Sequence, residues 1–239
     1  MLTKNQSIVL SRLKYRDYDL IVKCYTLQRG VVSYILRGVL KSKRGQSKTV
    51  YFQPLSQLLI EENYKPNQTL HSIKEAKLNY IYSSLHTDIF KSSIVMFLSE
   101  VLSLVLKEEE QNAELYNYLE TSFQYLDNED QFSNFHLLFL LRLTRYLGFY
   151  PERSNNEFLF FDLQSGIFTN TNNGIYTISG DNLTLLNQLL GINFDALHTL
   201  KINGKQRQAF LSMLLFYFEL HLEGFKKPKS LKVLNEVFR

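Results

Sequence analysis

The sequence predicts an α+β protein of two domains, a small β-barrel followed by a mostly α-helical domain that carries a small strand-and-turn insertion. Its 239 residues suit one large or two modest domains. Short glycine-punctuated apolar segments fill residues 1–78, whereas helical spacing dominates afterwards. The charge changes nearby, because residues 1–80 hold 14 Lys/Arg against 5 Asp/Glu (net +9) and residues 81–239 hold 13 against 18 (net −5). We therefore expect domains at 1–78 and 79–239.

The N-terminal segment has the pattern of short strands. Apolar, β-branched stretches at 8–10, 20–26, 31–36 and 55–61 are separated by Gly30, Gly38 and Gly45. Gln28 to Gly30 fits a hairpin turn in which Gly30 takes a positive φ. About five strands within roughly 70 residues favour a small closed or partly open barrel, because a sandwich normally needs about 100 residues.

Helical spacing begins at residue 79. It predicts one long helix or two in succession over 79–107, then helices over 113–126 and 132–147, the last ending at Gly148. Residues 152–180 break this pattern and predict the strand-and-turn insertion. Helices over 182–190 and 205–222 follow, and Gly224 closes the second.

Composition excludes several classes of protein. Cys24 is the single cysteine, so neither an internal disulfide nor a thiolate zinc cluster can form. Cys24 lies in a predicted strand, and we interpret it as a buried structural thiol. The apolar runs are shorter than the roughly 18 residues of a membrane span, and the charged N-terminus does not resemble a signal peptide. We expect an intracellular protein.

Two clusters of cations in the basic segment are candidates for phosphate contacts. The first is a predicted flexible loop between strands, containing Lys41, Lys43, Arg44 and Lys48. Such loops bind phosphates because each contact releases condensed counterions. A solvated surface loop is the alternative.

The second cluster interleaves cations with tyrosines. The cations are Arg12, Lys14, Arg16 and Lys23, and the tyrosines are Tyr15, Tyr18 and Tyr25. Unpaired bases stack on aromatic rings while the backbone follows the charge, so this mixture favours single-stranded nucleic acid. The alternative is that about half of these tyrosines belong to the barrel core.

Candidate catalytic groups are few. Asp17 and Asp19 could share a strand face as metal ligands of a nuclease, but pairing with nearby cations is the better interpretation. The five histidines show no metal-binding spacing, and no phosphate-binding glycine loop occurs. We therefore expect no enzymatic activity.

Arg142 and Arg145 are three residues apart on an otherwise apolar predicted helix and should project side by side. Guanidinium groups beside apolar surface suit a peptide carboxylate next to a hydrophobic side chain. Internal ion pairs with Glu100 or Glu120 are an equally good interpretation.

With these residues in view, the chain resembles the RecO family of bacterial recombination mediators. The segments that carry the resemblance are Arg12 to Thr26, Gly30, Arg37-Gly38, the basic segment Lys41 to Lys48, Gln53-Pro54-Leu55, Phe139 to Gly148, and Gly224 to Leu234. They occur in the order expected for the family and span nearly the whole chain.

The resemblance implies an OB-fold domain followed by a helical domain, and a non-enzymatic role in DNA repair in the cytoplasm, at the nucleoid. The implied activities are binding of single- and double-stranded DNA, annealing of strands coated by single-stranded DNA-binding protein (SSB) and, with RecR, loading of recombinase. It adds Arg37 to the expected DNA contacts and makes Arg142 and Arg145 candidate contacts of the acidic SSB tail. The alternative function is an adaptor whose basic barrel docks acidic protein surfaces.

One departure concerns metal. Several relatives carry a four-cysteine zinc module in the region that matches residues 152–180, whereas this stretch has no Cys and no His. We therefore expect no zinc and no other cofactor. Phe158, Phe160 and Ile175 are candidates for a small apolar core in place of the metal.

Overall fold

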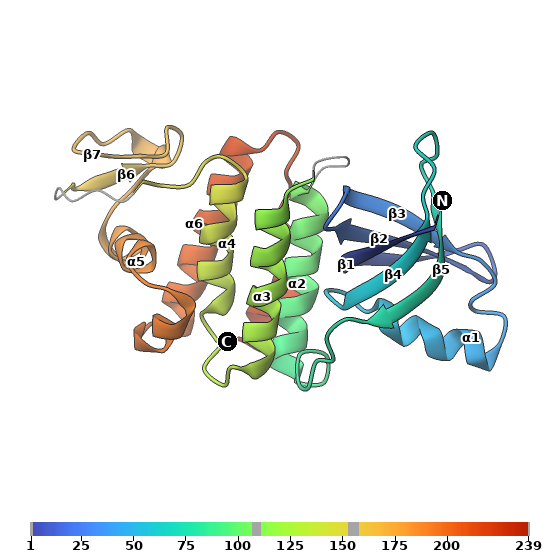
Figure 1. Cartoon of the computed structure of the whole chain (residues 1–239). Coiled ribbons are helices and arrows are strands. Elements are labelled where there is room, and N and C mark those ends of the chain that lie inside the picture. Colours follow the sequence, from blue (N-terminus) through green and yellow to red (C-terminus); the bar gives the residue numbers. More distant parts are fainter. Residues whose placement is uncertain (1, 107–110, 153–157, 239) are drawn as a thin grey trace. The chain divides into compact units, whose positions relative to one another are not determined.

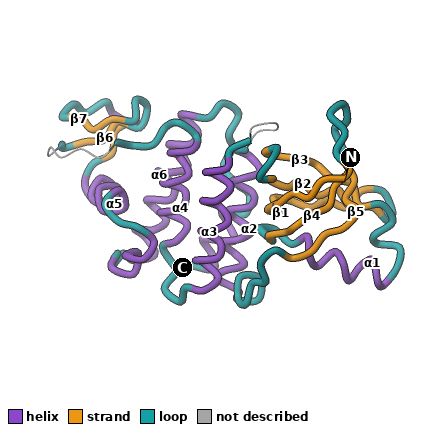
Figure 2. Tube along the Cα trace, viewed as in Figure 1, coloured by secondary structure: helices purple, strands orange, loops and turns teal. Residues whose placement is uncertain are grey.

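The computed structural model describes residues 2–106, 111–152 and 158–238 (Figure 1). The chain forms two compact units, Met1–Asn128 and Glu129–Arg239. Figure 2 shows strands in the barrel of the first unit and in a small sheet of the second, with helices in both.

The first unit begins with a five-stranded barrel. Its strands are β1 (Leu2–Tyr15), β2 (Asp19–Thr26), β3 (Gly30–Leu36), β4 (Gln57–Asn63) and β5 (His71–Leu78). They close in the order β1-β2-β3-β5-β4, with β4 paired back to β1. All pairs are antiparallel except β3 with β5, which are parallel and joined only at Tyr34–His71 and Ile35–Ser72. The barrel prediction is confirmed, and the topology is that of a five-stranded Greek-key barrel of the OB type.

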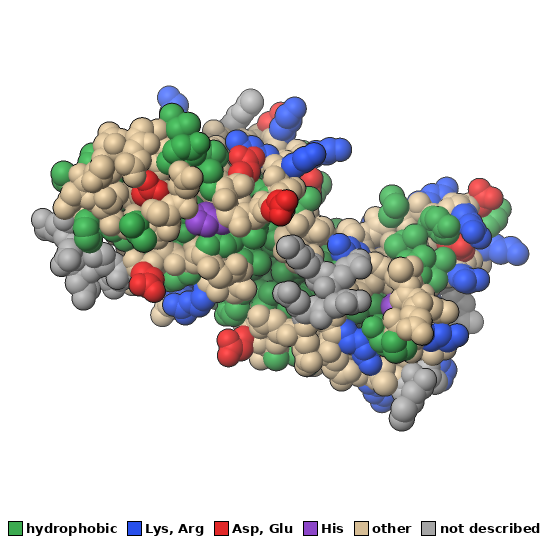
Figure 3. Space-filling model, turned by 90° about the horizontal axis from the view of Figure 1, so that it is seen from above, with side chains coloured by type: hydrophobic (Ala, Val, Ile, Leu, Met, Phe, Trp, Pro, Cys, Tyr) green, Lys and Arg blue, Asp and Glu red, His purple; other side chains and the backbone are tan. Residues whose placement is uncertain are grey.

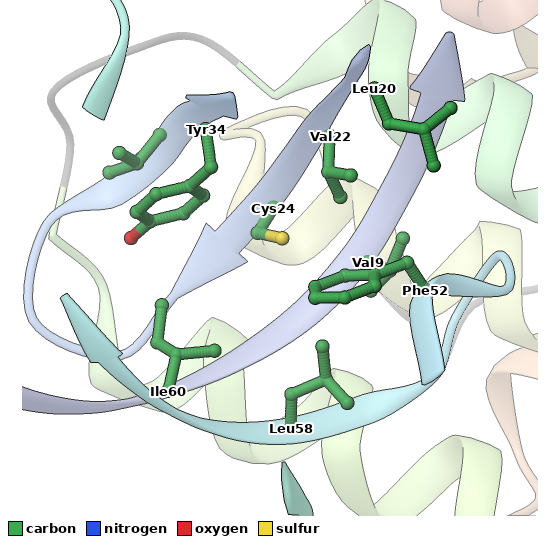
Figure 4. Close-up of a cluster of buried hydrophobic side chains, with 9 residues drawn as sticks. Val9, Leu20, Val22, Cys24, Tyr34, Phe52, Leu58 and Ile60 are labelled. Atoms are coloured by element: carbon green, nitrogen blue, oxygen red, sulfur yellow. The ribbon is translucent and has the colours of Figure 1, made fainter. Parts of the chain in front are cut away.

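Alternating side chains fill the barrel (Figure 4). The buried cluster comprises Val9, Leu20, Val22, Cys24, Val32, Tyr34, Phe52, Leu58 and Ile60. Cys24 is fully buried, as predicted for a structural thiol. Burial raises the pKa of Cys24 to about 12. The thiol is therefore protonated at neutral pH.

The basic segment before β4 is helical, so the prediction of a flexible loop was wrong. It forms α1 (Lys43–Lys48), which continues into the 3-10 helix η1 (Thr49–Phe52). Lys, Arg and Gln favour helix, and the Ser42 hydroxyl accepts the Gly45 amide at 3.1 Å in the manner of an N-cap. A Cβ on Gly45 would come within 2.2 Å of the Val39 carbonyl oxygen. Gly45 therefore allows α1 to approach the turn after β3 closely.

Two helices complete the first unit, α2 (Ile89–Val105) and α3 (Ala113–Asn128). α2 contacts β1, and the Gln57 amide of β4 donates to the Glu120 carbonyl of α3 at 2.8 Å. The last barrel strand ends at Leu78, whereas the compact unit that contains the barrel continues to Asn128. The division into domains at 1–78 and 79–239 stays a prediction.

Residues 79–88 are not helical, so helix over the whole of 79–107 was not correct. The Asp127 carboxylate accepts the amides of Ser83, Ser84 and Leu85, each at 2.8 Å, and holds this segment irregular. Asp88 then caps α2 by accepting the amides of Phe90 and Lys91. Hydrogen bonds to Asp127, which is about 40 residues away in the sequence, therefore prevent this segment from forming the helix that its apolar spacing predicts.

The second unit is mainly helical. Its helices are α4 (Phe135–Tyr146), α5 (Gly180–Leu190), η3 (Phe194–Thr199), α6 (Gly204–His221) and α7 (Leu231–Val237). α6 packs against both α4 and α5, and Gly148 ends α4 with a φ of 87°. The sequence pattern did not predict α7. Within the described ranges, the helices are all too short or too polar to cross a bilayer.

The predicted insertion is a three-stranded sheet of order β7-β6-β8, formed by β6 (Phe160–Asp162), β7 (Ile167–Thr169) and β8 (Thr177–Ile178), with η2 (Gly174–Tyr176) before β8. Its core differs from the prediction. Phe158 and Phe160 are half-buried and Ile175 is 80% exposed. Phe161, Leu163 and Ile178 are buried instead, and Phe161 contacts Tyr217 of α6 edge-on at 5.8 Å. Strand alternation turns Phe161 inward and its neighbour Phe160 away.

Candidate nucleic-acid interface

A groove opens in the barrel wall where β3 and β5 separate. The two strands pair only as far as Ile35 and Ser72, and beyond these residues the space between them has a volume of about 1070 Å³. The end of β3, the turn at Gly38, α1, η1 and β5 line it. Phe52 of η1 is at once part of the barrel core and of the groove floor. We call this space the β3–β5 groove.

The β3–β5 groove is basic. Of its described lining residues, Arg37, Lys48, Lys74 and Lys77 are cationic, and Glu75 alone is acidic. Lys77 pairs with Glu75 and Lys74 with Glu61, both at 3.2 Å and both partly exposed. Exposed pairs of this kind contribute about 0–1 kcal/mol, so a phosphate can replace them easily. On the face drawn in Figure 3, Lys and Arg side chains gather over the barrel.

The predicted basic segment lies at one edge of this groove. Lys48 lines it, whereas Lys41 and Lys43 are exposed near the start of α1 and do not. The side chain of Arg44 lies outside the described part of the structure. Arg12 belongs to the same region, because its Nη1 donates to the Thr49 carbonyl of η1 at 3.2 Å.

The strand register divides the other predicted cluster. Arg12 and Lys14 stand opposite Val22 and Leu20 in the β1–β2 ladder, whereas Lys23 stands opposite Ser11. Cross-strand partners share a face and neighbouring residues alternate, so Lys23 lies on the other face of the hairpin from Arg12 and Lys14.

The hairpin tip holds the remaining predicted contacts. Arg16 has a φ of 54°, and its guanidinium lies 5.2 Å from the centre of the Tyr15 ring. Tyr18 is exposed, but Tyr25 is buried and donates to the Asn112 carbonyl at 3.3 Å. Tyr25 is therefore a core residue, and the tyrosines do divide between surface and core.

Asp19 has a structural contact. Its Oδ1 accepts the Gly38 amide at 2.7 Å, which fixes the turn after β3 to the β1–β2 hairpin. This contact replaces the cation pairing that we expected for Asp19. Asp17 is exposed at the hairpin tip. In the parts of the chain that the structure describes, no three His, Cys, Asp or Glu side chains converge on a possible metal position.

Sequence reasoning missed the β5 side of the groove. Lys74 and Lys77 line it but were not singled out, because β5 is mostly polar and was not recognised as a strand. Tyr51 also lines the groove. Its position three residues after the last lysine of a basic segment was the signal that could have identified it.

The two arginines of α4 have different surroundings. Arg142 donates to the Ile192 carbonyl at 2.9 Å and to the Asn193 side chain, and its guanidinium lies 5.4 Å from the Phe194 ring centre. Arg145 is exposed, 4.8 Å from the Tyr150 ring centre. Arg142 is thus engaged in holding η3, whereas Arg145 presents its guanidinium to solvent on an aromatic ring.

The insertion does not fit a zinc ion of the four-cysteine kind. Residues 152–180 contain no Cys or His, and hydrogen bonds organise the described turns instead. Asp162 accepts the amide and hydroxyl of Ser165 at 2.8 and 3.0 Å, and the Asn173 amide at 2.5 Å. The hydrogen bond from Asn173, followed by those from Ser165, lowers the pKa of Asp162 below its ordinary value.

Comparisons with known proteins agree with this architecture. The domain family described as Recombination protein O N terminal matches residues 1–82, and Recombination protein O C terminal matches residues 86–232. Proteins named DNA repair protein RecO from Christiangramia forsetii and Flavobacterium psychrophilum are 51% and 44% identical to this chain. One from Porphyromonas gingivalis is 31% identical. Each alignment covers the full length of both proteins.

Proposed function

This chain belongs to the RecO family of DNA repair proteins, and from that premise we propose that it is a non-enzymatic, DNA-binding mediator of recombination. It binds single- and double-stranded DNA, anneals strands coated by SSB and, with RecR, helps to load recombinase. The observation that carries the proposal is the β3–β5 groove, whose described lining offers four cations against one carboxylate. Neutralising phosphates on two strands reduces their mutual repulsion, which is the physical requirement for annealing.

Salt-dependent binding tests the DNA contact. Labelled oligonucleotides titrated at several salt concentrations should give a log K that falls linearly with log[salt]. Changing Lys41, Lys43, Arg44 and Lys48 together to Ala should weaken binding and flatten the slope by about 0.7 for each single-strand phosphate that the variant no longer neutralises. The charge-matched control changes Lys226, Lys227, Lys229 and Lys232, all exposed in the second unit. Equal weakening in both variants would mean that net charge, rather than this segment, determines binding.

Annealing separates the mediator from an adaptor that docks acidic proteins. A mediator accelerates annealing of complementary strands, and continues to do so when SSB coats them. An adaptor binds acidic protein surfaces but leaves the annealing rate at its spontaneous value. The same cationic variants should slow annealing and retain their folded circular dichroism spectrum.

For the SSB tail, we propose Arg145 as the stronger of the two candidate contacts, because Arg142 already bonds to Ile192 and Asn193. A labelled acidic tail peptide should bind the wild type, and Arg145→Ala should weaken that binding by up to about fivefold, because an exposed ion pair contributes about 0–1 kcal/mol. Lys201→Ala, also exposed in the second unit, is the control. If Arg145→Ala bound the acidic tail peptide with wild-type affinity, Arg145 would not be a contact of the SSB tail.

We also propose that the insertion folds without metal. The Asp162 hydrogen bonds supply an organisation that zinc provides in relatives with four cysteines. Elemental analysis of purified protein checks this point, and stoichiometric zinc would contradict it.

A further inference from the structure

The β3–β5 groove combines its cations with apolar surface that phosphate binding does not require. Leu36, Val39, Ile73 and Ala76 are half-buried beneath it and pack on the barrel core. Three large side chains stand further out, since Tyr51 is 38% exposed, Leu78 37% and Ile81 77%. The groove therefore has an apolar base and outer wall together with basic side chains.

Exposed apolar side chains beside cations indicate a ligand with both a negative charge and a flat apolar face. A DNA duplex presents phosphates and sugars but keeps its base faces stacked inside. An unpaired nucleotide presents a phosphate and a free base face, and such faces stack on aromatic and apolar side chains. We propose that the β3–β5 groove takes unpaired bases of single-stranded DNA, with Tyr51 and Ile81 contacting base faces while the cations hold the backbone. This inference rests on the proposed DNA-binding function of the same groove.

The distribution of charge favours a strand that runs through the groove. Arg37 follows β3, Lys48 ends α1, and Lys74 and Lys77 lie on β5, so cations come from several elements of the lining. A polyanion uses all of these positions, whereas a single peptide carboxylate uses one. The volume of about 1070 Å³ is also slightly above the range of about 300–1000 Å³ for small-molecule pockets, which leaves room for more than one nucleotide.

The test removes the base and the side chain separately. Fluorescence anisotropy measures binding of a thymidine oligonucleotide, an abasic oligonucleotide with the same phosphates, and a duplex. Tyr51→Ala and Ile81→Ala should each weaken thymidine binding by about 5-fold, the lower end expected when one base stack is removed. Neither change should alter binding of the abasic strand or the duplex. Tyr51→Phe should retain wild-type affinity, because the ring remains.

Ile175→Ala is the matched control for Ile81→Ala, since Ile175 is 80% exposed and lies in the second unit. Both positions are exposed, so neither change removes core packing. Equal weakening on thymidine and abasic strands, or no weakening at all, would overturn the base-stacking inference. Salt-dependent binding by the wild type would then still support the proposed DNA contact. If instead an acidic peptide depended on Tyr51 and Ile81 while thymidine binding did not, the base-stacking inference would fail and the groove would be a protein-docking site.

Discussion

Asp127 joins the irregular segment before α2 to the end of α3, and its removal should destabilise the first unit. The carboxylate is buried and accepts three backbone amides at 2.8 Å, from Ser83, Ser84 and Leu85. The ammonium of Lys91 is buried as well, and donates at 2.8 Å to the Asp127 carbonyl and the Ser84 hydroxyl. Asp127→Ala therefore leaves the buried Leu85 amide and two partly buried serine amides without the carboxylate, and removes a negative charge near a buried ammonium.

The size of the effect follows from these hydrogen bonds. Hydrogen bonds to a charged group contribute about 1.5–3 kcal/mol each, so three of them set an upper bound of roughly 5–9 kcal/mol. The segment can relax, because Ser83 and Thr87 are exposed and their neighbours can reach water. We therefore expect a decrease of about 3–5 kcal/mol in the free energy of unfolding, below the summed value because part of the segment can exchange its hydrogen bonds for water.

Hydrogen exchange in increasing urea measures this decrease for each unit separately. Amides of the barrel, α2 and α3 should lose protection together, while amides of α4 and α6 keep theirs. The exposed Asp130 supplies the control, and Asp130→Ala should change protection by less than about 0.5 kcal/mol. A single hydrogen bond to a charged group contributes more than about 1 kcal/mol. If Asp127→Ala lowered the free energy of unfolding of the first unit by less than this, the three hydrogen bonds would not be what holds residues 83–85.

The ionisation of Asp127 adds a pH dependence. Burial alone would raise its pKa, but the amides of Ser83, Ser84 and Leu85 together outweigh burial and lower the pKa below its ordinary value. A lowered carboxyl pKa contributes stability above the unfolded pKa of about 3.9, and this stability is lost as the pH falls through the folded value. Asp127→Asn should lack this part of the acid sensitivity.

Three further predictions concern other buried groups. Burial, assisted by the charge of Arg207, lowers the pKa of His136 to about 3, so the unfolded state binds more protons between about pH 6.5 and 3. The second unit should therefore lose about 1.4 kcal/mol per pH unit on acidification within that interval, and His136→Leu should reduce this slope in urea unfolding. Cys24 should react with a thiol reagent only as fast as the protein unfolds, and rapid labelling in native buffer would contradict its burial. Asp162→Ala should speed amide exchange within the small sheet and leave α4 unaffected, whereas unchanged exchange there would show that the Ser165 and Asn173 bonds are dispensable.

Local signals succeeded where neighbouring residues alone decide the structure. Alternating apolar residues and Gly30, which has a φ of 65°, predicted the barrel, and helical spacing predicted α3, α4, α5 and α6 to within a few residues. Local signals failed at 79–88, because Asp127 lies some 40 residues away from the segment that it holds. They also failed at 41–48, where Ser and Gly indicated a loop but Ser42 caps a helix and Gly45 approaches Val39.

The candidate site divides in the same way. Charge counts predicted the basic character of the N-terminal module, and the resemblance added Arg37 to the expected DNA contacts. Arg37 and Lys48 both line the β3–β5 groove. Which of the candidate residues lie together could not be predicted, because strand register and burial depend on which strands pair. Strand pairing places Lys23 on the opposite face from Arg12 and buries Tyr25 in the core. It also brings Lys74 and Lys77 into one groove with Lys48.

The sequence by itself determined the class of the barrel, its positive charge, its isolated thiol and the family. The barrel class, the charge and the isolated thiol are properties of composition and local periodicity, which each segment carries without reference to the others. The family follows from the motifs and their order along the whole chain. Only the tertiary structure decided that β3 and β5 pair over two residues and then separate, leaving a groove lined by both cations and apolar side chains. The groove forms because β3 and β5, which are far apart in the sequence, stop pairing after two residues. The local sequence of either strand does not predict where this pairing ends.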